Sequence, residues 1–505
     1  MDEKLESGVL LPISSLPGRF GIGTIGKNAY EFIDFLSECG FSYWEILPIS
    51  ATGFGNSPYQ ALSAFGLNQF FIDFDLLADD KLLNSRDFQN LKFSDNPRKI
   101  NYKLIFENSN KILLKAFKRF NKSDFEFLTF KNNSIYREYA IYKVLKELND
   151  NKAWYDWRLE DRFFSSEIEN DVIINHQERL DFYIFTQFIF LKQWQKLVDY
   201  AHKKNIKIIG EIPHFLSYDS VSMYINPELF MLDKRNQMSF VAGFPPDDFK
   251  KDGQTWGEPL YDWNYLRSTH FKWWKLRINQ ALSLFDIVKI NHFSGFYKFY
   301  AVPFRSKNAK KGHFLFGPGE ELFKGMENDP ILASNLGIYD KNIDHFVKET
   351  GYPNLKVTLL PLFKNKPVYD RFLPSVLNFN SLAYVGNHDN NTLRGRVEIL
   401  TKEEKNTVLV KLSSECSKLG INFDPTRDSN HYMCDIVIEL LLKSKAKYTT
   451  LMLQDILYQG KDSRINIPGV LSDENWTYRF IKNDITDTII KKFKNLNKET
   501  NRFNQ

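Results

Sequence analysis

Short apolar runs recur along the chain, and each one ends in a polar turn or in a turn rich in glycine and proline. They occupy residues 41–49, 68–74, 205–213, 284–291, 330–337, 355–362, 382–390 and 448–457. Runs of Ile, Val, Leu and Phe without strict alternation are typical of strands that are buried on both faces. The pattern therefore predicts eight strands of a largely parallel sheet.

Helical patterns separate many of these runs, for example residues 27–40 before the first and 185–205 before the third. Eight strands that alternate with helices favour an α/β fold of the (β/α)8 TIM-barrel type with helical insertions. A doubly wound sheet is the alternative. It is disfavoured because no G-x-G-x-x-G sequence follows any of the predicted strands.

Residues 77–180 interrupt the alternation with a charged stretch of helical pattern, including residues 101–127. The stretch lacks the composition of a linker, so we expect a helical insertion within a single domain that spans residues 1–505. Its basic face could bind an acidic partner, but a solvated helix surface is the simpler interpretation. Residues 491–505 are expected to form a polar last helix and a frayed tail.

Composition narrows the class of protein. The 505 residues are 43% hydrophobic and 26% charged, which allows a large core, and a net charge of +5 is too small to suggest a nucleic-acid partner. Three cysteines without a C-x-x-C pair fit a reducing compartment. The N-terminus has no signal-peptide pattern and no apolar run approaches the ~20 residues that span a bilayer, so a cytoplasmic location is predicted.

Candidate chemistry lies at the ends of the predicted strands, because functional side chains of a barrel gather at the C-terminal ends of its strands. The polar residues at those ends are Glu211, Asn291, His292, Ser334, Asn335, His388, Asp389, Asn390, Gln454 and Asp455. An early loop, residues 51–66, adds Ser57 and Tyr59. No H-E-x-x-H or similar ligand spacing occurs, and we expect no metal, nucleotide or flavin cofactor.

Several long motifs follow one another in a distinctive order. They are LPISSLPGRFGIGTIG, GFGNSPYQALSAFG, NPELFMLD, VAGFPPDDFKKDGQTWGEPLYDW, GNHDNNT and QDILYQGKDSRINIPGVLSDENW. In this order the chain, from about residue 8 to residue 480, resembles the amylomaltase family of 4-α-glucanotransferases, glycoside hydrolase family 77. The resemblance implies retaining transfer of α-1,4-glucan segments, with α-1,4-glucans and maltooligosaccharides as the partners.

The same resemblance assigns roles to individual positions. Asn291 stands where the family has the nucleophilic Asp of RIDHF, and Ser334 stands where it has the acid/base Glu of AEDLG. Asp389 matches the third acid, in HDN. The positions that the family implies for glucan binding are Ser57, Tyr59, Asp247, Trp256, Lys289, His292, Asn335, His388 and Asn466.

Two of these substitutions, Asn291 and Ser334, stand at the positions that carry out the family's reaction. An Asn amide cannot form the glycosyl ester that a carboxylate forms, and Ser334 is shorter than Glu and not a usual proton donor. The sequence therefore predicts a transferase that is impaired or inactive; a non-catalytic glucan-binding or regulatory protein and a working enzyme with a relocated acid are the alternatives. Asp286, at the start of the Asn291 strand, and Glu327, in the loop before Ser334, are the candidates for such an acid, but neither lies at a strand exit. Changes at Lys289, Ser294 and Asn335 fit drift after loss of catalysis.

Overall fold

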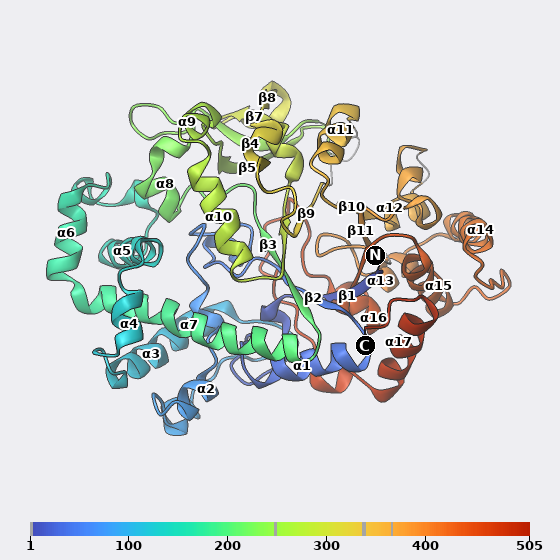
Figure 1. Cartoon of the computed structure of the whole chain (residues 1–505), viewed down its shortest axis with the longest axis horizontal. Coiled ribbons are helices and arrows are strands. Elements are labelled where there is room, and N and C mark those ends of the chain that lie inside the picture. Colours follow the sequence, from blue (N-terminus) through green and yellow to red (C-terminus); the bar gives the residue numbers. More distant parts are fainter. Residues whose placement is uncertain (1–3, 247–249, 336–339, 365–366, 505) are drawn as a thin grey trace.

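Eight parallel strands close into a barrel at the centre of the molecule (Figure 1). The computed structural model describes residues 4–246, 250–335, 340–364 and 367–504. The barrel strands follow the order β1-β12-β11-β10-β9-β6-β3-β2. Their bounds are β1 Glu6–Leu10, β2 Tyr43–Glu45, β3 Lys207–Ile212, β6 Ile287–Ile290, β9 Ile331–Ala333, β10 Asn354–Val357, β11 Ser381–Tyr384 and β12 Tyr448–Met452. The predicted (β/α)8 TIM barrel is confirmed.

Helices surround this barrel on its outer side (Figure 1). They are α1 Lys27–Glu38, α2 Phe74–Asp79, α3 Tyr102–Arg119, α4 Phe125–Phe130, α5 Ser134–Leu148, α6 Ser166–Asn175, α7 Gln177–Lys203, α8 Val221–Ile225, α9 Trp263–Ser268, α10 Lys272–Leu282, α11 Lys341–Glu349, α12 Leu359–Phe363, α13 Leu393–Glu398, α14 Lys402–Leu419, α15 Asn430–Lys443, α16 Leu453–Ile456 and α17 Asp487–Glu499. Among the described residues, no helix is both long and apolar enough to cross a bilayer.

The strand predicted at residues 68–74 is wrong. Residues Gln69–Phe71 form a single 3-10 turn, and the carboxylate of Asp73 caps the start of α2 by accepting from the amides of residues 75 and 76. The backbone of this segment finds its partners in side chains of α7. Gln187 bonds both backbone groups of Leu67, and Gln193 bonds both backbone groups of Asp73. Two glutamines on a helix thus replace the neighbouring strands that the prediction required.

The strand that completes the barrel is β1, which the sequence pattern did not single out. It pairs in parallel with both β12 and β2. Gly8 lies at its centre, facing the ring of Tyr43, and a Cβ atom at that position would overlap the ring. The absent side chain lets the large Tyr43 fill the barrel interior, where it is completely buried.

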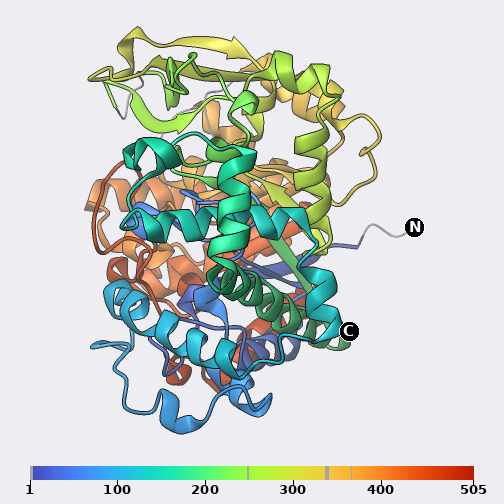
Figure 2. The ribbon, with the colours of Figure 1, turned by 90° about the vertical axis from the view of Figure 1, so that its left-hand side faces the viewer.

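A second sheet stands beside the barrel and was not predicted. Its four antiparallel strands, in the order β5-β4-β7-β8, are β4 Phe240–Phe244, β5 Gln254–Pro259, β7 Lys298–Pro303 and β8 His313–Phe316. It forms the top layer of the molecule in Figure 2. One of its faces joins the main core through Ala242, Phe299 and Ala301, and a small cluster of its own covers the other face: Met238, Val241, Tyr300, Val302 and Ala309.

The end of the chain is anchored and not frayed, which corrects the prediction for residues 491–505. Helix α17 forms as expected, but Arg502 beyond it is completely buried. Its guanidinium donates to five backbone carbonyls, those of Glu6, Leu442, Ser444, Ala446 and Lys447, at 2.6–3.4 Å. Because Glu6 begins β1 and residue 447 precedes β12, this one side chain ties together the two strands that close the barrel.

We expect Arg502→Met to destabilise the fold by about 3–5 kcal/mol, because five buried carbonyls would lose a charged donor. The midpoint of urea unfolding measures the change. Lys445→Met is the matched control, since Lys445 lies on the same segment and is exposed. Equal midpoints for the two variants would contradict a structural role for the anchor.

Candidate active site

Three charged side chains lie stacked inside the barrel, below its C-terminal mouth. The Lys289 amine, from β6, lies 2.5 Å from Oε1 of Glu45, from β2, and 3.1 Å from Oε2 of Glu211, from β3. The side chains of both glutamates are fully buried, and that of Lys289 is 2% exposed. Burial alone would lower the pKa of Lys289, but the attraction of Glu211 and Glu45 outweighs it and raises that pKa.

Neutral donors complete this cluster. The Tyr384 hydroxyl, from β11, lies 2.7 Å from both oxygens of Glu45, and the Thr450 hydroxyl, from β12, donates to the same carboxylate at 3.0 Å. Burial and the neighbouring Glu45 raise the pKa of Tyr384 well above its ordinary value, so it stays a donor. Five barrel strands therefore meet at one buried ionic network.

Asn291, at the exit of β6, is bound to this network. Its side-chain nitrogen Nδ2 donates to Oε1 of Glu211 at 2.9 Å, and its backbone amide donates to the carbonyl of Ile212 at 2.9 Å. The other oxygen of Glu211 accepts from the Tyr59 hydroxyl at 2.8 Å. Glu211 therefore holds both Asn291 and Tyr59, and each of its oxygens already has a partner.

Ser334 lies beside Asn291 at the exit of β9. Its backbone amide donates to the carbonyl of Ile290 at 3.0 Å, and its carbonyl accepts from the amide of Phe293 at 3.0 Å. Those two contacts bracket Asn291, so the structure brings the two substituted positions together. Ser334 is 7% exposed, and Asn335 after it is half-buried.

A second group of predicted residues surrounds Asp389. Its Oδ1 accepts from Nδ2 of Asn466 at 2.7 Å and lies 3.5 Å from Nε2 of His388. The ring of His388 stacks on Tyr59 with centroids 5.0 Å apart. Because 41% of the Asp389 side chain is exposed, this carboxylate faces solvent from a fixed position.

His292 presents its ring from a strained backbone. Its φ of 49° is left-handed, a conformation that is uncommon outside glycine. The ring meets Trp256 edge-on at 5.2 Å and Phe215 at 5.7 Å. Burial lowers the pKa of His292 to about 4, so the imidazole is neutral at pH 7 and can donate from one ring nitrogen and accept at the other.

A large cavity of about 1390 Å³ opens beside Tyr59 and Asp389, whereas Asn291, His292, Ser334, Asn335 and His388 are not among its lining residues. The predicted residues that line it are Ser57, Tyr59, Trp256, Asp389 and Asn466. Lys289 instead lies beneath the cleft, where its amine is paired with carboxylates and cannot reach a ligand in the cavity. The predicted Asp247, like its neighbour Asp248, lies outside the described residues.

The sequence offered signals for two residues that it did not assign to the site. Glu45 is the one charged residue within the apolar run 41–49, and a charge in a strand buried on both faces requires a partner. Glu211 stood at a strand exit but received no role. Its role depends on Asn291, Tyr59 and Lys289, which the fold places around its carboxylate.

Glu258, from β5, is a further acid of the cavity wall and was not predicted. One carboxylate oxygen accepts from the side-chain amide of Gln60, and the other, Oε2, is buried without a hydrogen-bond partner. Both residues line the cavity. Burial raises the pKa of Glu258 to about 7, so this carboxyl keeps its proton at pH values below about 7.

Neither alternative acid occupies the mouth of the barrel. Asp286 accepts from the backbone of Ile208 at 2.7 Å and from His202 at 2.8 Å, before β6 begins and so at the opposite end of the barrel. Glu327 accepts from the amide of Gly325 in an exposed turn. Asp455, at the exit of the eighth predicted strand, has a structural role. Its Oδ1 accepts from the amide of Leu393, at the start of α13, at 2.7 Å.

Within the part of the chain that the structure describes, no group of three or more His, Cys, Asp or Glu residues could hold a metal ion.

A closed parallel barrel with a large cavity of aromatic and polar side chains beside Asp389 defines a TIM-barrel protein with a site large enough for an oligosaccharide. Comparison with known proteins identifies it further. The family model described as 4-alpha-glucanotransferase matches residues 11–483. The chain belongs to the 4-α-glucanotransferase family, as the sequence motifs predicted.

Its relatives cover nearly the whole chain. The 4-alpha-glucanotransferase of Clostridium butyricum is 37% identical over 95% of this chain and 97% of its own length. That of Aquifex aeolicus is 35% identical over 95% of this chain and 96% of its own. Among solved structures, an amylomaltase from Streptococcus agalactiae in complex with acarbose superposes with a TM-score of 0.91 at 33% identity, covering 99% and 100% of the two chains.

The raised pKa of Glu258 predicts a pH-dependent stability. The folded state favours the protonated form of Glu258. The stability that Glu258 contributes to the fold is therefore lost as pH rises from about 4.5 to about 7. Glu258→Gln removes this loss. The melting temperature of the variant should therefore rise relative to that of the unaltered chain as pH increases from about 4.5 to about 7. Glu228→Gln, at an exposed position, serves as the control. Parallel pH profiles for Glu258→Gln and the unaltered chain would contradict the assignment.

Proposed function

We propose that this member of the 4-α-glucanotransferase family binds α-1,4-glucans and maltooligosaccharides but that its transfer reaction is impaired or absent. The observation that carries the proposal is the side chain at the nucleophile position: Nδ2 of Asn291 donates a hydrogen bond to Oε1 of Glu211 at 2.9 Å. An amide held in this way cannot form a glycosyl ester.

The requirements of the family reaction support this proposal. Retaining transfer needs a nucleophile and an acid/base with carboxyl groups about 5–5.5 Å apart. Asn291 and Ser334 supply neither, and the nearby Glu211 is fully buried with both oxygens engaged. Loss of a central catalytic group costs on the order of 10⁴–10⁶ in rate, and the two losses need not add because the groups act together.

The cavity wall supports retained binding. Tyr59 and Trp256 offer apolar ring faces for sugars, while Asp389 and Asn466 offer hydrogen-bonding groups. The positions of these groups do not depend on carboxylates at residues 291 and 334. Binding and chemistry are therefore separable in this site.

Glu258 favours a second candidate, a transferase of residual activity. Its carboxyl lines the cavity with a raised pKa, which is the property of a proton donor. It supplies no nucleophile, so it could support only a slow reaction. Loss of any residual turnover in Glu258→Gln would distinguish this candidate from the first.

Binding is tested by thermal unfolding with maltoheptaose. A ligand at 100 times its Kd adds ~2.7 kcal/mol of stability, so the unaltered chain should melt at a higher temperature with the sugar than without it. Asp389→Ala should lose most of this shift because the exposed carboxylate is removed. Absence of a shift with every α-glucan would refute the binding proposal.

Catalysis is tested by disproportionation of maltotriose, which yields glucose and longer oligosaccharides if transfer occurs. We expect silence from the unaltered chain and turnover by the double variant Asn291→Asp/Ser334→Glu. The intact mass of the protein must be checked, because deamidation of Asn291 would create the same carboxylate. Clear turnover by the unaltered chain would show that another acid performs the chemistry.

The Asn291→Asp single variant has a further consequence. Its carboxylate would lie within hydrogen-bonding distance of Glu211, and two such groups cannot both ionise freely. One of the pair should keep its proton, so the variant should lose stability relative to the unaltered chain as pH rises above about 4.5. Melting temperatures from pH 4 to pH 8 measure the difference, and a constant difference over that range would contradict the expected repulsion.

A further inference from the structure

The cavity continues well past the residues at the barrel mouth. At about 1390 Å³ it exceeds the roughly 300–1,000 Å³ of a typical small-ligand pocket. Its wall includes Tyr155, which follows α5, and Tyr218, which precedes α8. In Figure 1 α5 and α8 lie to the left of the barrel, whereas α13, just after Asp389, lies to its right. The cavity therefore has a second end that the family motifs did not point to.

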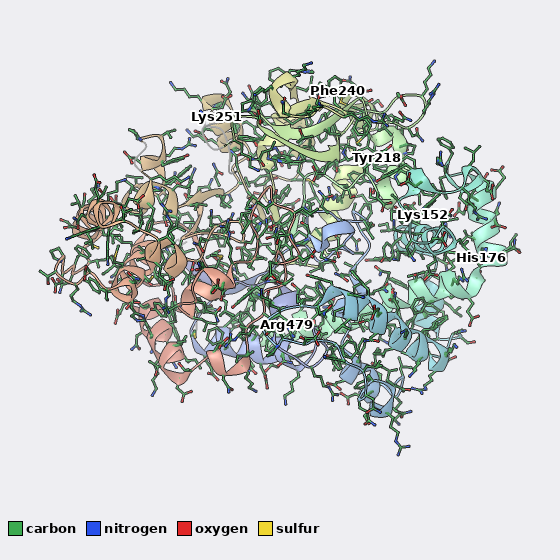
Figure 3. All side chains as sticks on the ribbon, turned by 180° about the vertical axis from the view of Figure 1, so that it is seen from behind. Lys152, His176, Tyr218, Phe240, Lys251 and Arg479 are labelled. Atoms are coloured by element: carbon green, nitrogen blue, oxygen red, sulfur yellow. The ribbon has the colours of Figure 1, made fainter. Side chains whose placement is uncertain are left out.

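Two tyrosine rings form a flat platform at this second end. The rings of Tyr155 and Tyr218 stack with centroids 4.9 Å apart and planes inclined by 16°. Tyr155 is 39% exposed, a large fraction for an aromatic side chain. Figure 3 shows Tyr218 between Phe240 of β4 and Lys152, beyond the end of α5. A stacked pair buried in the core would leave no face open, whereas this pair lies on the wall of a cavity.

Hydrogen bonds hold the platform in place. The Trp154 indole nitrogen donates to the carbonyl of Tyr218 at 2.7 Å, and its backbone amide donates to Oδ1 of Asp219 at 3.1 Å. The other oxygen of Asp219 is paired with the Lys146 amine at 2.5 Å, and the Tyr218 hydroxyl donates to the carbonyl of Asn236 at 2.9 Å. The two rings come from distant segments: Tyr218 is held by its own hydrogen bond, and Tyr155 is placed by its neighbour Trp154 and by its stacking on Tyr218.

Polar groups surround the rings. The cavity wall at this end also contains Lys143, Asn151, Ser217 and Asp219. Burial lowers the pKa of Lys143 to about 8, so its amine still carries its proton near pH 7 and can donate hydrogen bonds. A flat aromatic face bordered by hydroxyl, amide and amine groups suits a sugar ring, which is apolar on its faces and polar around its edge.

We propose that Tyr155 and Tyr218 form a remote glucosyl subsite, which binds the far part of an α-1,4-glucan whose other part lies at Asp389. The inference rests on the proposed function, since it requires that the cleft binds α-glucans. It adds a length preference: chains long enough to reach the platform bind more tightly than short ones. Short maltooligosaccharides occupy only the barrel mouth.

The test is calorimetric titration with maltotriose, maltoheptaose and longer maltooligosaccharides. Loss of one aromatic contact costs about three- to tenfold in affinity. We expect Tyr155→Ala to raise the Kd of the long chains by this factor and to leave that of maltotriose unchanged. Tyr155→Phe keeps the ring and should bind like the unaltered chain. Tyr265→Ala removes a comparably exposed tyrosine from α9 and should alter neither Kd.

The outcomes separate the two proposals. If the unaltered chain binds short and long glucans and Tyr155→Ala matches it at every length, the platform is refuted and glucan binding stands. An equal loss at all lengths would also refute the platform, because a remote subsite cannot affect maltotriose. If no α-glucan binds the unaltered chain, both proposals fail. Melting temperatures of the variants confirm that each one is folded.

Discussion

The ionic network inside the barrel determines how the rest of the site is arranged. Glu45 and Glu211 share the Lys289 amine in a region that water does not reach, and the desolvation of three charges is a cost that only close pairing offsets. The network takes side chains from five strands, so it fixes the mutual position of those strands at the level of the cleft floor. Because Glu211 also binds Asn291 and Tyr59, that geometry extends directly into the residues a ligand would meet.

A neutral amide at position 291 suits the charge of the ionic network beneath it. The network already carries two carboxylates for one ammonium, and the Asn291 nitrogen donates a hydrogen bond to the carboxylate that needs it. An aspartate there would add a third negative charge within reach of Glu211. The site is thus electrostatically satisfied without a nucleophile, while Tyr59, Trp256 and Asp389 still line the cavity above it. The residues that line the cavity and those of the ionic network therefore lie in different layers of the same barrel.

The sequence predicted those features that depend on local pattern, and it missed those that depend on contacts between distant segments. The run 284–291 was identified as a strand because a strand buried on both faces must be apolar. The run 68–74 has the same character, but Gln187 and Gln193 on α7 satisfy its backbone, and no local pattern reveals them. Asn291 and Ser334 were located by long motifs. Glu211 and Glu258 were not assigned, because an acid acquires its role from the partners that the fold places around it.

The anchor made by Arg502 also determines when the barrel can close. The guanidinium binds the carbonyl of Glu6 across 496 positions of sequence. Ribosomes add about 5–20 residues per second, so roughly 25–100 s separate the synthesis of these two residues. For most of that interval β1 lacks its partner β12, and the open edge of an unfinished parallel sheet is prone to aggregation. Closure of this barrel is therefore late in folding, because β1 must wait for segments that lie more than 400 residues further along the chain.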